Sequence, residues 1–119
     1  MARSKSSKDD IRKSIATMFG YALDTSLDAI RPSYQFDVSC QGSVPQSLIA
    51  FLESTSYEDA IRNAISLGGD ADTMACIAGA VAEAYYGGVP ENIAVTVSSI
   101  LDDHLRTIVA RFKSTTART

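Results

Sequence analysis

The feature that most constrains the fold is a run of small and apolar residues that begins directly after two glycines and two aspartates. Residues 66–87 read SLGGDADTMACIAGAVAEAYYG. This run contains Glu83 and is too short to cross a bilayer, so it predicts a buried helix from the Asp-Ala-Asp-Thr segment to about Tyr86, with Gly87 as its stop. Its smallest residues would let neighbouring helices pack closely: Ala71, Ala75, Ala78, Gly79 and Ala82.

Composition limits the class of protein around this helix. The chain has 119 residues, of which 45% are hydrophobic and 21% charged. These values predict a single globular domain over residues 1–119 with one modest core. A net charge of −3 argues against a nucleic-acid partner, and no apolar segment is long enough to favour a membrane.

Cysteine usage and the start of the chain bear on localisation. Cys40 and Cys76 show neither metal-ligand spacing nor a disulfide framework, which favours two free thiols in the cytoplasm. The opening MARSKSSK is basic, but no apolar run follows it, so it is not a secretory signal.

The remaining sequence predicts further helices joined by turns. Apolar residues at helical spacing place the first helix over residues 9–23. In the loop that follows, 27–30 is expected to form one helical turn and 34–40 to be extended. A second helix is expected to start at Ser43, which would be its N-cap ahead of Pro45 in the first turn.

Two more helices complete an all-α fold of about five helices. Ser56 predicts the start of the third, with Asp59 as the capping-box partner and Gly68 as the stop. The fifth would start near Pro90 and carry one continuous apolar stripe. That stripe comprises Ile93, Val97, Ile100, Leu101, Leu105, Ile108, Val109 and Phe112. Residues 113–119 are polar and are expected to fray.

Asp70, Asp72 and Thr73 are the candidate functional residues. Side chains two positions apart do not share a helix face, but Gly68 and Gly69 would let the backbone turn there so that both carboxylates converge. With the Thr73 hydroxyl they would form a cluster of hard oxygens that suits Mg²⁺, Mn²⁺ or Ca²⁺ better than zinc. The alternative is that one aspartate caps the helix and the other only sits at its positive end.

The same stretch resembles the C-terminal signature of the ADP-ribosylglycohydrolase family, which includes the glycohydrolase that reactivates dinitrogenase reductase. FDVSCQGSVPQSLIAFLESTSYEDAIRNAISLGGDADT is similar to the bacterial branch, and GYALDTSLDAIRPSYQFDVSCQGS and LDDHLRTIVARF also fit. The resemblance covers residues 11–112. It implies an all-helical fold with a binuclear Mg²⁺ or Mn²⁺ centre and hydrolysis of the bond between ADP-ribose and a protein side chain or small acceptor. The family's Asp-x-Asp-Thr motif supplies metal ligands, which implies that role for Asp70, Asp72 and Thr73.

The chain also departs from the family pattern. Family members are much longer, and their N-terminal half carries a Gly-Asp-rich opening motif and a Thr-Asp-Asp-type motif that completes the metal site. Neither motif is present here, and the pairs Asp9–Asp10 and Asp102–Asp103 are expected on solvated helix positions instead. We therefore expect the C-terminal part of such a fold, with half of a metal site, weak Mg²⁺ or Mn²⁺ binding and no identifiable catalytic base.

Two functions follow as expectations. In the first, the chain is a glycohydrolase that acts on an ADP-ribosylated substrate only together with an N-terminal complementing chain. In the second, it is a non-catalytic helical interaction module. In both, its apolar faces would need a partner, which predicts a homo-oligomer or a complex with the complementing chain.

Overall fold

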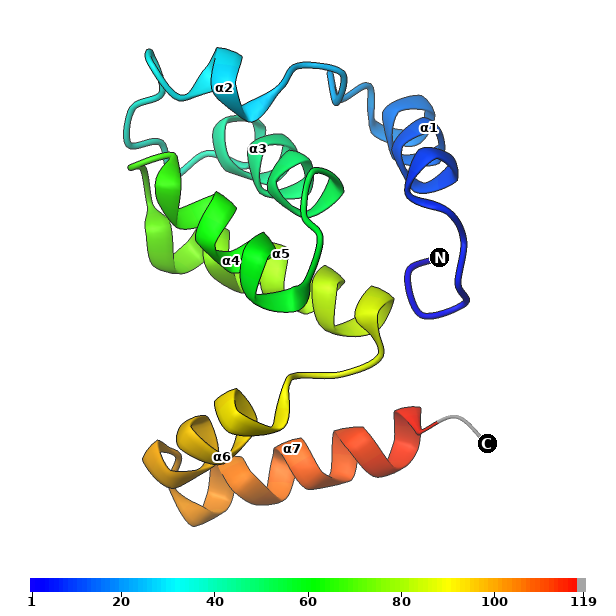
Figure 1. The fold of residues 1–119 in the computed structure, drawn as a ribbon, viewed down its shortest axis with the longest axis vertical. Helices are drawn as coiled ribbons and strands as arrows, with labels where there is room; N and C mark the ends of the chain where they lie inside the picture. Colours follow the sequence, from blue (N-terminus) through cyan, green and yellow to red (C-terminus); the bar gives the residue numbers. More distant parts are fainter. Residues whose placement is uncertain (118–119) are drawn as a thin grey trace. The chain divides into compact units, whose positions relative to one another are not determined.

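The computed structural model describes residues 1–117, which form seven α-helices and no strand (Figure 1). The helices are α1 (Lys8–Phe19), α2 (Leu27–Ile30), α3 (Cys40–Leu52), α4 (Tyr57–Ser66), α5 (Ala71–Tyr86), α6 (Glu91–Ile100) and α7 (Asp103–Thr116). The all-α prediction is therefore confirmed. The chain divides into two compact units, Met1–Gly88 and Val89–Thr119. The single domain over residues 1–119 stays a prediction.

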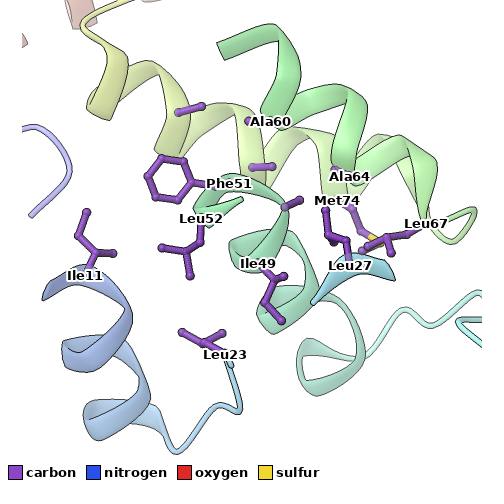
Figure 2. Close-up of a cluster of buried hydrophobic side chains, with 13 residues drawn as sticks. Ile11, Leu23, Leu27, Ile49, Phe51, Leu52, Ala60, Ala64, Leu67 and Met74 are labelled. Carbon is purple, nitrogen blue, oxygen red and sulfur yellow. The ribbon is translucent and has the colours of Figure 1, made fainter. Parts of the chain in front are cut away.

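The core of the first unit is built where α3, α4 and α5 pack against one another. Thirteen apolar side chains are buried there, ten of them labelled in Figure 2. Phe51 of α3 and Met74 of α5 are fully buried large side chains. Gly79 faces α4, where a Cβ placed on it would meet Ile61 Cδ1 at 3.4 Å, an ordinary van der Waals distance. Ala78, Gly79 and Ala82 are all buried, so small residues of α5 line its contact with the core.

The ends of α4 follow the sequence signals. Ser56 is the N-cap, and its hydroxyl accepts a hydrogen bond from the Asp59 N–H at 3.1 Å. The Asp59 carboxylate reaches back to the Thr55 N–H at 2.9 Å. Gly68 adopts φ +74° directly after the helix, where its N–H donates to the Ile65 carbonyl. Both the cap and the stop are confirmed.

The start of α3 differs from the prediction. Its N-cap is Ser39, four residues before the expected Ser43, and the Ser39 hydroxyl accepts from the Gly42 N–H at 3.1 Å. Asp37 fixes Ser39 in turn by accepting hydrogen bonds from its N–H and its hydroxyl, at 2.8 and 2.6 Å. Ser43 is buried and donates to the Ser39 carbonyl, and Pro45 lies inside the helix. The Asp-x-Ser pair sets the helix start, and the Ser-x-Pro pair does not.

Two other boundaries were also predicted wrongly. The first helix ends at Phe19, because Gly20 adopts the left-handed conformation with φ 71° and its N–H closes the last turn on the Ala16 carbonyl. In the second unit, the predicted continuous helix is interrupted. Leu101 is extended, and Asp102 caps a new helix by accepting from the Leu105 N–H at 2.8 Å.

The break changes the predicted apolar stripe of the second unit. Its residues are divided between α6 and α7, with Leu101 in the extended break between them, and neither helix has a buried residue. Exposed apolar side chains include Val97, Leu105, Ile108 and Phe112. The polar tail is helical as far as Thr116, so 113–116 belong to α7, whereas residues 118 and 119 lie outside the described part.

Candidate metal centre

The loop that presents the candidate ligands is shaped by two glycines with different roles. Gly68 supplies the left-handed turn after α4. Gly69 is needed because Tyr34 packs against it: a Cβ at this position would lie 2.3 Å from Tyr34 Cε2. No real Cβ tolerates such a distance, so only glycine fits without moving the ring. The loop is thus fixed by a residue 35 positions earlier in the sequence, counting from 34 to 69.

Asp70 occupies the N-cap position of α5 but does not cap the helix through its side chain. Its backbone is non-helical, with φ −72° and ψ 75°, and its carbonyl accepts from the Met74 N–H at 3.0 Å. The side chain makes no capping hydrogen bond, unlike those of Ser7, Ser26, Ser39, Ser56 and Asp102, the N-caps of five of the other helices. A capping role therefore does not account for the Asp70 carboxylate.

The Asp72 carboxyl group interacts with its neighbours at the start of α5. The Asp70 side chain is the main cause that lowers the pKa of Asp72, and hydrogen bonds from the backbone N–H groups of Thr73 and Asp72 lower it further. The Thr73 N–H donates to Asp72 Oδ1 at 3.0 Å. Asp70 is half-buried, while Asp72 and Thr73 are exposed. The turn before α5 thus brings together the two carboxylates that a regular helix would separate.

This set of donors fits part of a divalent-cation site. Two carboxylates and a neighbouring hydroxyl are the hard oxygen ligands that Mg²⁺ and Mn²⁺ prefer. Within residues 1–117, however, no cluster of three or more His, Cys, Asp or Glu side chains is arranged to hold a metal ion. The donors present are consistent with the expected half site, and the assignment of Asp70, Asp72 and Thr73 as metal ligands stays a prediction.

The other two aspartate pairs have local structural roles. Asp9 and Asp10 lie in the first turn of α1, where Asp9 pairs with Lys13 at 3.1 Å. Asp102 caps α7, and Asp103 pairs with Arg106 at 2.6 Å. Asp102 is thus a helix cap, whereas the sequence placed the pair together on a helix face.

Tyr34 is the residue near the loop that sequence reasoning missed. Its hydroxyl donates to the Gly42 carbonyl and contacts Met74 Sδ at 3.4 Å. Burial raises its pKa, and the negative charges of Asp37 and Asp70 raise it further. Tyr34 therefore lies within the electrostatic reach of Asp70. No short-range motif marks it, because its importance comes from contact with a loop distant in sequence.

A pocket of about 530 Å³ opens on the side of Tyr34. Its lining comes from α2, the following loop and the first turns of α3, and includes Ile30, Phe36, Asp37 and Gln46. Phe36 is 67% exposed, and the Oε1 atom of Gln46 is buried without a hydrogen-bond partner. The pocket thus offers an exposed ring and an amide beside the tyrosine that packs on the aspartate loop.

Comparison with known proteins identifies the family. The sequence model of the ADP-ribosylglycohydrolase family matches residues 3–118. The chain therefore belongs to this family, and the helical fold agrees with that assignment. No curated protein and no solved structure gave a match. In the part of the chain that the structure covers, no helix is both long and apolar enough to cross a membrane.

Proposed function

We propose that this chain contributes the Asp-x-Asp-Thr half of a metal-dependent ADP-ribosylglycohydrolase site. The observation that carries the proposal is that the Asp70 side chain, which directly follows the Gly68–Gly69 turn, makes no capping hydrogen bond and is left available for a ligand, in a chain that matches the family over residues 3–118. The interaction of Asp70 with Asp72, which lowers the pKa of Asp72, supports it.

The residues have distinct proposed roles. Asp70, Asp72 and Thr73 would hold Mg²⁺ or Mn²⁺ through their side-chain oxygens. When bound, such an ion orients the ribose hydroxyls and a water molecule and acts as a Lewis acid. Tyr34 positions the loop by packing against Gly69, and the pocket beside it is the proposed place for part of the substrate. A catalytic base is not assigned to this chain.

The remaining ligands would come from an N-terminal complementing chain. Two carboxylates and one hydroxyl leave most positions of a six-coordinate ion open. We propose that the complementing chain supplies the Thr-Asp-Asp-type motif of the family and that the substrate is an ADP-ribosylated side chain or small acceptor. The two exposed free thiols, Cys40 and Cys76, fit the reducing cytoplasm that we propose as its location.

The second candidate is a non-catalytic helical interaction module. It is favoured by the exposed apolar side chains of α6 and α7, among them Leu105, Ile108 and Phe112. Such side chains would serve self-association or binding of a complementing chain equally well. Neither a membrane nor a nucleic acid is proposed as a partner.

Complementation of activity separates the two candidates. The chain is mixed with a separately produced N-terminal half of an ADP-ribosylglycohydrolase that carries the Thr-Asp-Asp motif, and release of ADP-ribose from a modified protein is measured with Mg²⁺. We expect release only in the mixture, and none in a mixture made with Asp72→Asn. A mixture that is equally inactive with both forms of the chain, although the two halves bind each other, favours the interaction module.

A further inference from the structure

The N-terminal segment, residues 1–20, contacts the rest of the first unit through few side chains. Helix α1 buries Ile11 (Figure 2), and Ala2 and Ile15 are partly buried against the core. Arg3 Nη2 pairs with Glu83 Oε2 of α5 at 2.6 Å, with both side chains partly buried. Met18 and Phe19 at the far end of α1 are 65% and 60% exposed. The contact made by Lys8 is of a different kind.

The ammonium group of Lys8 lies inside a cage of aromatic rings. Its Nζ is 5.2 Å from the ring centroid of Phe51, 5.4 Å from that of Tyr85 and 5.2 Å from that of Tyr86. The rings meet nearly at right angles, with interplanar angles of 74°, 69° and 86° for the three pairs. They therefore form separate walls around one point. Each ring face attracts a cation, and the attraction grows where water is excluded.

Oxygen atoms complete the recognition of the ammonium group. Lys8 Nζ donates to the Ser54 carbonyl and to Tyr86 Oη, the latter at 2.8 Å. The acceptors are held in place independently of Lys8. Tyr86 Oη donates to the Ser54 carbonyl at 2.8 Å, and the Ser54 hydroxyl donates to the Phe51 carbonyl at 2.6 Å. Phe51 is fully buried and Ser54 is 4% exposed, and Tyr85 and Tyr86 are partly buried against the core, so the walls are anchored on the core.

We propose that Phe51, Ser54, Tyr85 and Tyr86 form a binding site for a primary alkylammonium group, and that Lys8 occupies it to fasten residues 1–20 to the first unit. Directed N–H donors and a compact positive charge are both used, which favours lysine over the planar guanidinium of arginine. The site lies at the C-terminal end of α5. It is ~24 Å from the Asp70 end, at 1.5 Å per residue over the helix, so it does not depend on the proposed function.

The first test removes the cation while keeping the side-chain length. Hydrogen exchange of full-length Lys8→Met is compared with wild type, with Lys13→Met as the matched control because Lys13 pairs with exposed Asp9 on the same helix. Loss of the cation–aromatic and hydrogen-bond contacts should speed exchange of the α1 amides about tenfold or more, with α3 to α5 unchanged. The control should behave as wild type. Unchanged exchange of α1 in Lys8→Met would overturn the fastening role.

The second test asks what the emptied cage binds. Methylammonium chloride is titrated into Lys8→Ala, which removes the side chain from the cage, and into wild type, and the ring signals of Phe51, Tyr85 and Tyr86 are followed by NMR. We expect saturable shifts in Lys8→Ala only, and weaker binding of tetramethylammonium, which has no N–H donor. Shifts of equal size in wild type, or none in Lys8→Ala, would show that these rings are not an ammonium site filled by Lys8.

Discussion

The two ends of α5 use their polar groups in opposite ways. At the C-terminal end, Tyr86 Oη pairs with Lys8 and Ser54, and the rings around it are buried or half-buried. At the N-terminal end, the Asp70 carboxylate caps nothing and meets a second carboxylate, Asp72, that is exposed. Polar groups that are hydrogen-bonded within the fold contribute to its stability, whereas the Asp70 carboxylate makes no capping bond that would explain its position. We therefore interpret the C-terminal end as a packed end and propose the N-terminal end as the binding end.

The C-terminal end of α5, here called the closed end, should lose more stability than the N-terminal end, here called the open end, when a side chain is truncated. Phe51 is fully buried, is a wall of the Lys8 cage and contacts both Tyr85 and Tyr86 edge to face. Phe51→Ala is expected to lower the free energy of unfolding by ~3–5 kcal/mol, the usual cost of removing a buried aromatic ring. Urea denaturation followed by circular dichroism measures this. A loss below ~1 kcal/mol would mean that the closed end is loosely packed.

At the open end, the largest structural effect should come from Gly69. Gly69→Ala would place a Cβ 2.3 Å from the Tyr34 ring. Because the ring must move, we expect destabilisation of ~1–3 kcal/mol, as for overpacked sites. The double variant with Tyr34→Ala removes the collision, so Gly69→Ala should cost much less in that background. Equal costs in the two backgrounds would contradict the role of Tyr34 in fixing the loop.

Two N-cap residues give a smaller and more direct contrast. Ser56→Ala removes a capping bond and should cost ~1 kcal/mol. Asp70→Asn removes no capping bond and should change the free energy of unfolding by no more than ~0.5 kcal/mol. Thermal and urea unfolding of both variants provide the comparison. A cost at Asp70 equal to that at Ser56 would restore the capping interpretation of this aspartate.

The pH dependence of Asp37 supplies the smallest effect. Hydrogen bonds from the Ser39 hydroxyl and N–H lower the pKa of this half-buried carboxyl group below its usual 3.8. Its contribution to stability is therefore present above pH 3.8 and is lost as the pH falls through the lowered pKa. The stability difference between wild type and Asp37→Asn should shrink from pH 6 to pH 3. A difference that stays constant or grows towards pH 3 would contradict this coupling.

The sequence predicted those features that depend on neighbouring residues. The Ser56 cap and the Gly68 stop follow from side chains within four positions, and the helix between them formed as expected. The errors arose where two local signals competed. Ser39 with Asp37 started α3 ahead of Ser43, and Asp102 capped a new helix where apolar periodicity predicted continuation.

Features that depend on tertiary contacts were not predictable from one sequence. Glycine at position 69 was expected only to ease the turn, and its close approach to Tyr34 is visible only in the folded chain. The Lys8 cage joins α1 to the ends of α3 and α5, which lie more than forty residues away in the sequence. For the candidate site, the sequence named the aspartates, and the fold added the absence of a capping bond and the contact between the carboxyl groups.

The proposal that residues 70–73 form a metal half site is tested most directly by locating where a divalent cation binds on the chain. Mn²⁺ is titrated into the isotope-labelled chain, and paramagnetic broadening of the backbone amide signals is measured by NMR. We predict weak binding, with a dissociation constant on the order of 1 mM as for sites with few protein ligands. Broadening should be strongest around residues 70–73, lost in Asp70→Ala and retained in Asp103→Ala. Broadening centred on another acidic pair, or unchanged by Asp70→Ala, would contradict the assignment of this loop as the metal half site.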